Sequence, residues 1–310
     1  MESARNCGMA KRPKARKRST ALPEAFLARL EEIVGRSSFE KITKSFVKRP
    51  TTFRINTIQG KKKRVLDELK RAGLKVEHVR WCRNAFVLKK GERKELFQTN
   101  AYKDGAIYVQ SLASMVPVVV MDPKPGETIL DLTAAPGSKT SQMAAMMKRQ
   151  GALVANDVNR VRFFKLKHNM EHLGVMDEID GWDVTLRMEH GVPLARSHAE
   201  RFDAVLLDAP CSAEARFVKG DPKSFGYWKP RKIKEMAGKQ RSLLMAAWGA
   251  LRPGGRLVYS TCTFAPEENE RQIAKFLEKV DDARIVPISL PGLKVMPGMT
   301  RWRDKVFSEE

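Results

Sequence analysis

The sequence is poor in the features that mark a disulfide scaffold, a zinc protein or a membrane protein. It has four cysteines in 310 residues, widely spaced and without a C-x-x-C pair, so we expect neither a disulfide framework nor a metal site. No apolar run approaches the roughly 20 residues that span a bilayer, so we expect no membrane insertion. The charged amino terminus lacks a following apolar segment, unlike a secretory signal. These absences predict a cytoplasmic protein, which we expect to be monomeric.

Acidic residues are scarce relative to basic ones. The chain has 58 Lys and Arg against 36 Asp and Glu, which gives a formal charge of +22 and a pI near 10.0. Such an excess favours a polyanionic partner, and nucleic acid is the natural candidate, although a ribosomal or membrane-surface protein would share the charge. The hydrophobic share of 42% is enough for a sizeable core, and the length suits two domains or one domain with an appendage.

The first third of the chain predicts two different segments. Residues 1–20 are rich in Lys and Arg and predict a flexible basic tail, which either touches phosphates or is simply solvated. Residues 21–98 predict a small basic α/β module, with an amphipathic helix over 22–34, an alternating TTFRINTI stretch and a helix over 62–72 that ends at Gly73. The pattern changes near residue 98, so we place a second domain at 99–310.

The second domain alternates strand and helix patterns, after a short strand at 107–109 and a helix at 112–120. Helical patterns follow over residues 138–149, 160–173 and 233–251. Five apolar strand candidates occupy residues 128–132, 153–155, 179–182, 204–207 and 257–259. This alternation implies right-handed crossovers and a mostly parallel sheet with helices on both faces. The predicted fold class is therefore α/β, with a doubly wound, Rossmann-like core.

The loop after the first of these strands has neither G-x-G-x-x-G nor a Walker A pattern, which argues against nicotinamide binding and against a phosphate cradle. Instead Asp131 leads into LTAAPGSKT, in which Ala134, Ala135 and Gly137 keep the turn small and Ser138 can cap the next helix. A bare backbone with amides directed at the site suits a nucleoside that bears a carboxylate. S-adenosylmethionine fits this description.

Acidic residues follow successive strands. Asp157 lies 26 residues after Asp131, where a Rossmann-like fold places an acid that binds ribose hydroxyls. Asp183, after the expected third strand, could accept from an adenine amino group, and Asp208 follows the fourth strand. Each acid alone is a weak signal, because acids at strand ends are often caps or solvated. Together they favour a nucleoside site.

Two of the four cysteines also follow strands. Cys211 lies in DAPCSAEA, and Cys262 lies between the strand-like residues 256–260 and a helical pattern that opens at Pro266. The two are 51 residues apart, on strands expected to be neighbours, so we expect the thiols to meet. Inert packing and a redox pair are alternatives. The nucleotide-type loop and a reducing location favour a covalent nucleophile with a helper thiol.

The motifs DLTAAPGSKT, NDVNRVRFFKLKHNMEHLG, DAPCSAEARF and YSTCTFAPEENE, with FRINT and YVQSLASM upstream, carry a specific resemblance. Over about residues 45–293 the sequence resembles the RsmB/RsmF/Sun-type family of RNA cytosine-5 methyltransferases. DAPC and VQSLASM are most similar to the RsmF-like bacterial ribosomal RNA branch. The resemblance implies S-adenosyl-L-methionine as cofactor, an RNA substrate and a small N-terminal RNA-binding module.

The resemblance also implies roles for individual residues. Cys262 is the expected nucleophile, Cys211 assists product release, Asp208 hydrogen-bonds the base at N3, and Lys139 lies near cofactor and base. A buried acid with a raised pKa at position 208 would make C6 of the base more electrophilic. The expected cofactor site comprises Ala134, Ala135, Pro136, Gly137, Ser138, Lys139, Asp157, Arg162, Asp183 and Asp208.

The sequence departs from the family pattern in two places. The usual PCSG-x-G reads Ser212-Ala213-Glu214-Ala215 here, which replaces two glycines and is expected to restrict the loop. No GFF-like closing strands follow Leu293, so we expect an unpaired sheet edge.

Three hypotheses for the function therefore remain. Methylation of ribosomal RNA is the leading one, and transfer RNA is the alternative substrate within the same enzyme class. The third is an inactive RNA-binding or ribosome-assembly factor of the same fold. Arg54, Arg80 and Arg83 could hold the RNA backbone or could equally be solvated.

Overall fold

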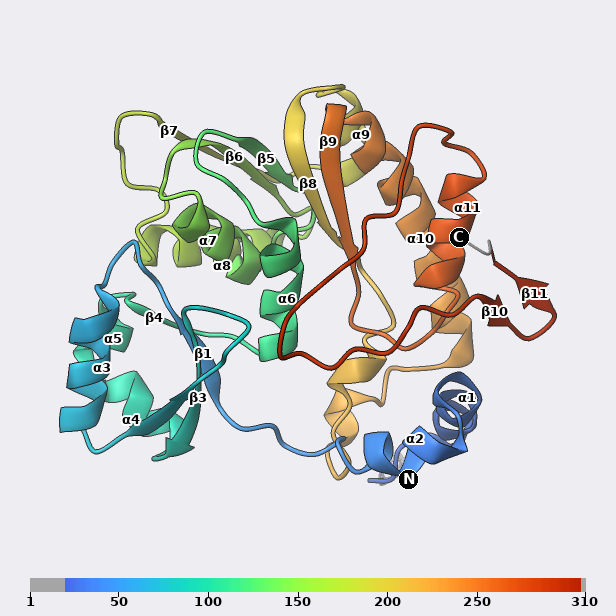
Figure 1. The fold of residues 1–310 in the computed structure, drawn as a ribbon, viewed down its shortest axis with the longest axis horizontal. Helices are drawn as coiled ribbons and strands as arrows, with labels where there is room; N and C mark the ends of the chain where they lie inside the picture. Colours follow the sequence, from blue (N-terminus) through green and yellow to red (C-terminus); the bar gives the residue numbers. More distant parts are fainter. Residues whose placement is uncertain (1–19, 308–310) are drawn as a thin grey trace, which may run out of the picture.

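The computed structural model describes residues 20–307, so the predicted basic tail lies outside the described residues except for its last position. The larger part is a five-stranded parallel sheet in the order β7-β6-β5-β8-β9, in the upper half of Figure 1. Its strands are β5 (Thr128–Asp131), β6 (Gly151–Asn156), β7 (Trp182–Arg187), β8 (Phe202–Asp208) and β9 (Leu251–Ser260). The middle residues of the central strands β5 and β8 are apolar and fully buried, as expected for strands covered on both faces.

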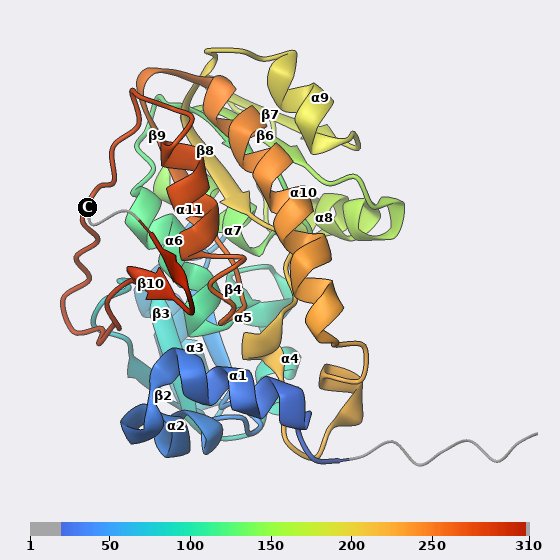
Figure 2. The ribbon, with the colours of Figure 1, turned by 90° about the vertical axis from the view of Figure 1, so that its right-hand side faces the viewer.

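Helices cover both faces of this sheet. One layer comprises α6 (Leu112–Met121), α7 (Ser138–Met146) and α8 (Arg160–His172). The other comprises α9 (Gly191–Arg196), α10 (Pro230–Gly249) and α11 (Glu270–Leu277), with α10 and α11 in front of the sheet in Figure 2. Along β5, Ile129 packs into the first layer and Leu130 into the second, because successive side chains of a strand point to opposite faces. The predicted doubly wound α/β core is confirmed.

A second, antiparallel sheet has the order β2-β3-β1-β4. Its strands are β1 (Thr52–Ile55), β2 (Lys75–His78), β3 (Ala85–Lys90) and β4 (Ile107–Val109). The helices α3 (Lys62–Arg71), α4 (Arg93–Gln98) and α5 (Asn100–Lys103) accompany it. β4 pairs with β1, with Tyr108 opposite Arg54, so this sheet extends beyond the division that we predicted at residue 98.

The first two helices pack far from that sheet, as Figure 1 shows. They are α1 (Glu24–Val34) and α2 (Arg36–Thr43), and they contact the segment after β8, which includes the short 3-10 turns η1 (Glu214–Arg216) and η2 (Pro222–Ser224). Phe26 is 1% exposed and lies edge-on to Phe217 at 4.8 Å and to Trp228 at 5.8 Å between ring centroids. Aromatic pairs in this geometry add to the energy of burial.

The outer strands differ from the rest of the sheet. β9 pairs with β8 alone among the described strands. The hairpin of β10 (Arg301–Trp302) and β11 (Lys305–Val306) forms a separate two-stranded sheet. At the opposite edge the predicted third strand was placed too early: Gly181 has φ +75° and makes a turn, and β7 begins after it. No helix in the described part of the chain is long and apolar enough to cross a membrane.

Candidate active site

The loop between β5 and α7 is bare because α8 packs closely against it. Gly137 precedes α7 with φ +96°, and a Cβ atom at this position would lie 2.5 Å from Met170 Cε and 2.9 Å from Leu166 Cδ1. Ser138 does not cap the helix as predicted; it is the first helical residue, and its side chain makes no cap hydrogen bond. The first-turn amides and the positive end of the α7 dipole therefore face the carboxyl edge of the sheet.

Acidic side chains surround this loop. Asp157 is 3% exposed, accepts a hydrogen bond from the Ala135 amide at 3.3 Å and pairs with Arg162 at 3.2 Å. Arg162 also donates to the Ala135 carbonyl at 2.5 Å. Asp131, below the loop, accepts from Thr140 Oγ1 at 2.6 Å, and burial raises its pKa to about 7. The predicted cofactor residues 134–139, 157 and 162 are thus gathered around one turn.

Asp183 is not part of this group. It is the second residue of β7 and lies opposite Ala152 near the start of β6, so it lies at the amino ends of the strands and not at the carboxyl ends, where the loop is. The prediction that it accepts from adenine was therefore wrong. Glu189 follows the end of β7 instead, and its amide donates to Asn156 Oδ1 at 3.0 Å. The turn at Gly181 and the alternating residues of β7 were the signals that would have placed this strand correctly.

Cys211 and Cys262 meet at the carboxyl ends of β8 and β9. Their Sγ atoms are 3.3 Å apart, and the Cys262 amide lies 3.3 Å from Cys211 Sγ. The hydrogen bond from the Cys211 thiol lowers the pKa of Cys262, whereas the same bond and burial raise the pKa of Cys211. This asymmetry favours loss of the proton from Cys262 over loss from Cys211, and a thiolate is the reactive form of cysteine.

Asp208 and Lys139 lie beside the two sulfurs. Lys139 Nζ lies 2.6 Å from Asp208 Oδ2 and 3.2 Å from Ser114 Oγ, and Ser260 donates to Asp208 Oδ1 at 2.8 Å. The Asp208 side chain is 38% exposed, so it is a partly exposed, ion-paired carboxylate and not the buried acid that we expected. Positive charge from Lys139 also helps to lower the pKa of Cys262.

A basic groove of about 820 Å³ adjoins this cluster. Its lining includes four cations, Lys48, Arg49, Arg93 and Lys94. The guanidinium of Arg49 donates to the carbonyl of Ala215, whose amide donates to the Cys262 carbonyl at 3.0 Å. On the other side the lining reaches Ser111, the N-cap of α6, one turn from the Ser114 hydroxyl that contacts Lys139. Two lining residues, Arg49 and Ser111, thus link the groove to the segment after Cys211 and to the helix that carries Ser114.

Arg54 does not lie on the surface as predicted. It is 2% exposed, its Nε donates to Gln110 Oε1 at 3.0 Å, and its guanidinium also donates to Ser141 of α7. Burial lowers its pKa to about 10. Arg54 therefore ties the antiparallel sheet to α7 and is too buried to hold RNA, whereas Arg80 and Arg83 are exposed.

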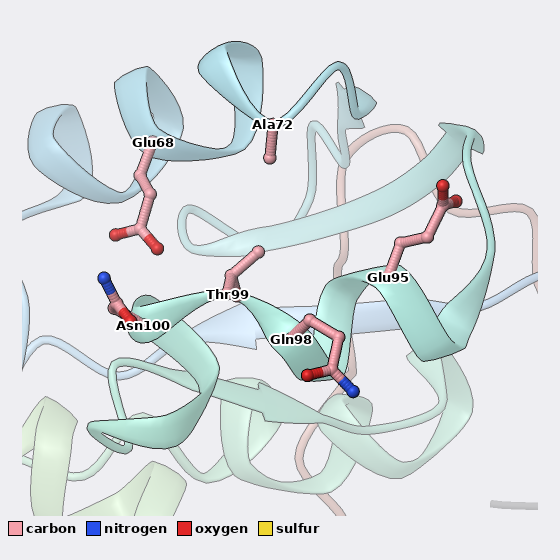
Figure 3. Close-up of a pocket in the computed structure, with 6 residues that line it drawn as sticks. All are labelled: Glu68, Ala72, Glu95, Gln98, Thr99 and Asn100. Carbon is pink, nitrogen blue, oxygen red and sulfur yellow. The ribbon is translucent and has the colours of Figure 1, made fainter.

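Other features of the chain lie apart from this cluster. Cys82 is 8% exposed and burial raises its pKa, while Cys7 lies outside the described residues. Within residues 20–307 no group of three or more His, Cys, Asp or Glu side chains could hold a metal ion. A hollow of about 360 Å³ between α3 and the α4–α5 segment, shown in Figure 3, contains none of the predicted residues. Its lining is Glu68, Ala72, Glu95, Gln98, Thr99 and Asn100.

Comparisons with known proteins match both parts of the chain. A family model described as "16S rRNA methyltransferase RsmB/F" matches residues 118–304, and one described as the N-terminal domain of 16S rRNA methyltransferase RsmF matches residues 22–112. A tRNA (cytosine(49)-C(5))-methyltransferase from Pyrococcus abyssi is 37% identical over 84% of this chain and 80% of its own length.

Other relatives differ in how much of their length is matched. The ribosomal RNA small subunit methyltransferase F of Aliivibrio fischeri is 36% identical over 84% of this chain but only 55% of its own length. The chain thus spans little more than half of the relatives of that name. The crystal structure of a methyltransferase homologue from Pyrococcus horikoshii has a TM-score of 0.72 at 32% identity, over 84% of this chain and 80% of that one.

Proposed function

Because the chain belongs to the RsmB/F family of 16S rRNA methyltransferases, we propose that it methylates C5 of a cytosine in ribosomal RNA through a covalent cysteine adduct. Membership of the family confirms the resemblance inferred from the motifs, and the cofactor of the family is S-adenosyl-L-methionine. The observation that carries the proposal is the 3.3 Å approach of Cys211 and Cys262 beside the bare β5–α7 loop.

The residues around that loop fit the cofactor. The small side chains at 134 and 135 and the absent one at 137 let a ligand approach the backbone, and the α7 amino terminus suits a carboxylate. Asp157 is a carboxylate at a strand end, where ribose hydroxyls can donate to it. When bound, S-adenosyl-L-methionine supplies an electrophilic methyl group to the site.

The two cysteines divide the chemistry on the base. The Cys262 thiolate forms a bond to C6, which converts the ring to an enamine and makes C5 nucleophilic. After C5 has been methylated, its proton passes to a water molecule, the C–H electron pair restores the C5–C6 double bond, and the electron pair of the S–C6 bond leaves with Cys262 as a thiolate. The Cys211 thiol lies next to the leaving sulfur and assists this release.

Asp208 and Lys139 prepare the base for attack. A cytosine protonated at N3 donates to the Asp208 carboxylate, and this proton makes C6 more electrophilic. Lys139 holds Asp208 in place through the 2.6 Å ion pair and sets a positive charge beside the thiolate. Lys139 and Asp208 are therefore assigned to activation of the cytosine as well as to the cofactor site.

The RNA must present the cytosine unpaired, because stacking in a duplex hides C5 and C6. Three of the four cations of the groove, Lys48, Arg93 and Lys94, suit phosphates on either side of the flipped nucleotide. Exposed Arg80 and Arg83 belong to the same small module and remain predicted contacts. The match of residues 22–112 to an RsmF N-terminal domain supports an RNA-binding role for this region.

The experiment incubates the protein with labelled S-adenosyl-L-methionine and unmethylated ribosomal RNA and then digests the RNA to nucleosides. We expect 5-methylcytosine from the wild type, a trapped covalent RNA adduct from Cys211→Ala, and no adduct from Cys262→Ala. Cys82→Ala, which changes a remote buried thiol, is the matched control and should behave as the wild type. An adduct that survives in Cys262→Ala would contradict the mechanism.

Two other functions correspond to other outcomes. If the protein methylates transfer RNA and not ribosomal RNA, its activity is the one for which its Pyrococcus abyssi relative is named. An inactive RNA-binding factor would bind RNA without turnover. The observation that favours this last function is Ala213, which replaces a family glycine and has φ +59° in the loop after Cys211.

A further inference from the structure

Each of the two cysteines is followed by a buried hydroxyl residue, and the two hydroxyls contact each other. Ser212 is 0% exposed and Thr263 is 9% exposed, and their Oγ atoms are 2.8 Å apart across the two loops. A buried carboxylate lies at each end of this pair: Ser212 Oγ contacts Glu268 Oε1, and Thr263 Oγ1 lies 2.9 Å from Glu214 Oε2. Four side chains thus form one continuous row.

The row has one hydrogen too few unless a carboxyl group supplies it. Its three oxygen-to-oxygen contacts each need one hydrogen, and the two hydroxyl groups provide only two. Ionised carboxylates only accept hydrogen bonds, so one of the two glutamates must carry the third hydrogen. Leaving two buried acceptors face to face would be costly.

The N–H groups around the two carboxyls decide which one is protonated. Both oxygens of Glu214 accept from N–H groups, Oε1 from Trp228 Nε1 at 2.9 Å and Oε2 from the Phe264 amide at 3.1 Å. Glu214 also feels the positive charge of Arg29. A hydrogen on Oε1 would face the Trp228 N–H, and one on Oε2 would leave a weaker acceptor for the Phe264 amide, so Glu214 is the better ionised end of the row.

Glu268 differs in one oxygen. Its Oε2 accepts from the Ser212 amide and from Gln240 Nε2, both at 2.9 Å, whereas Oε1 contacts only the Ser212 hydroxyl. Glu268 is 0% exposed; the Tyr259 hydroxyl near it donates to the Glu268 backbone carbonyl at 2.6 Å and leaves its side chain untouched. Oε1 is therefore the one position in the row that has room for the hydrogen.

We infer that Glu268 is protonated on Oε1 and is a positioning residue for the two cysteine loops. The hydrogen bonds then run in one direction, from Glu268 to Ser212, from Ser212 to Thr263, and from Thr263 to the Glu214 carboxylate. Gln240 extends the support, because its Nε2 also donates to the Pro210 carbonyl at 2.9 Å, on the other side of Cys211. The row fixes the spacing of the residues that follow Cys211 and Cys262.

The inference predicts an asymmetry between two conservative variants. In Glu268→Gln the amide NH₂ takes the place of the protonated oxygen and donates to Ser212, so the row is preserved. In Glu214→Gln the NH₂ must face either the Trp228 or the Phe264 N–H, so the row is broken. Burial raises the pKa of both glutamates, which alone would predict no difference between the variants.

The first test is infrared spectroscopy of the full chain at pH 7. The difference spectrum between the wild type and Glu268→Gln should contain the C=O stretching band of a protonated carboxylic acid. A difference spectrum with carboxylate bands alone would overturn the inference. This measurement needs no RNA, no cofactor and no activity, and it decides the matter even if Glu214→Gln does not fold.

The second test measures the spacing of the loops. A diazenedicarboxamide oxidant accepts the two electrons and two protons that Cys211 and Cys262 release when they form an S–S bond, and peptide mass spectrometry gives the rate. We expect the oxidation rate of Glu268→Gln to lie within about twofold of the wild-type rate. The rate of Glu214→Gln should be lower by about tenfold or more, because the free-energy cost of a broken buried hydrogen bond corresponds to a factor of about that size. Equal rates for the two variants would refute the positioning role.

The effect on catalysis rests on the proposed function and is measured separately. Methyl transfer should follow the same order, with kcat falling in Glu214→Gln and KM for RNA unchanged, because none of the four residues of the row lines the groove. If the wild type makes no 5-methylcytosine while the infrared and oxidation results hold, the proposed function fails and the protonated row stands. If the wild type is active and Glu268→Gln is as impaired as Glu214→Gln, the row fails and the proposed function stands.

Discussion

Replacement of Gly137 by alanine separates backbone strain from close packing in the loop that we assign to the cofactor. The backbone has φ +96°, where an L-residue costs about 1–2 kcal/mol. The new Cβ would also lie 2.5 Å from Met170 Cε and 2.9 Å from Leu166 Cδ1, and overpacking of this kind costs about 1–3 kcal/mol. The expected loss in the free energy of unfolding is therefore about 2–5 kcal/mol.

Gly126 is the matched control, because it has φ +87° and a Cβ atom at this position would meet nothing within 4 Å. Gly126→Ala should lose only the backbone part, about 1–2 kcal/mol. Urea unfolding of the three proteins, analysed with a common slope, gives the difference between the variants, which should be about 1–3 kcal/mol. Equal losses at the two positions would show that α8 does not press on the loop and would refute the reasoning.

Three further predictions concern protonation, RNA and the altered loop. The free energy of unfolding of Asp131→Asn should rise relative to that of the wild type as pH rises from about 4 to 7. In the wild type the pKa of this carboxyl is raised from 3.8 to about 7 by folding, so the protonated carboxyl stabilises the folded state, and this stabilisation is lost over that pH window. Urea titrations across this range check it, and a constant difference would contradict it. Lys48→Glu should weaken RNA binding and reduce the dependence of log K on log salt by about 1, whereas Lys70→Glu, outside the groove, should not. Ala213→Gly should raise the free energy of unfolding by about 1 kcal/mol, because φ +59° suits glycine; no change would mean that the loop relaxes.

The sequence predicted the elements of the parallel sheet well where both faces are covered. β8 contains the buried apolar run 204–207 and β5 the buried pair Ile129 and Leu130, and short apolar stretches bounded by turn residues are consistent with buried strands. β7 is an outer strand and is only partly buried, so apolar and polar residues alternate along it, and the stretch 179–182, which spans the turn at Gly181, was mistaken for it. That error alone placed Asp183 at the carboxyl ends of the strands in the prediction, whereas it lies near their amino ends.

The site was predictable in position but not in detail. The meeting of Cys211 and Cys262 depends on the order of two neighbouring strands, which the alternation of strands and helices implies. The burial of Arg54 depends on β1 being a central strand covered on both sides, and no local pattern reveals this for a cation. The exposure of Asp208 and the row from Glu214 to Glu268 depend on side-chain contacts between distant segments, which spacing along the chain does not encode.

The packing of α1 has a consequence for the synthesis of the chain. The partners of Phe26 include Phe217 and Trp228, so α1 leaves the ribosome long before the residues that cover it have been made. Until then its aromatic face has no native cover and is exposed to aggregation or to a chaperone. Once docked, α1 closes over Trp228, whose indole N–H holds Glu214. A helix made early thus completes the support of the two thiol loops only at a late stage of folding.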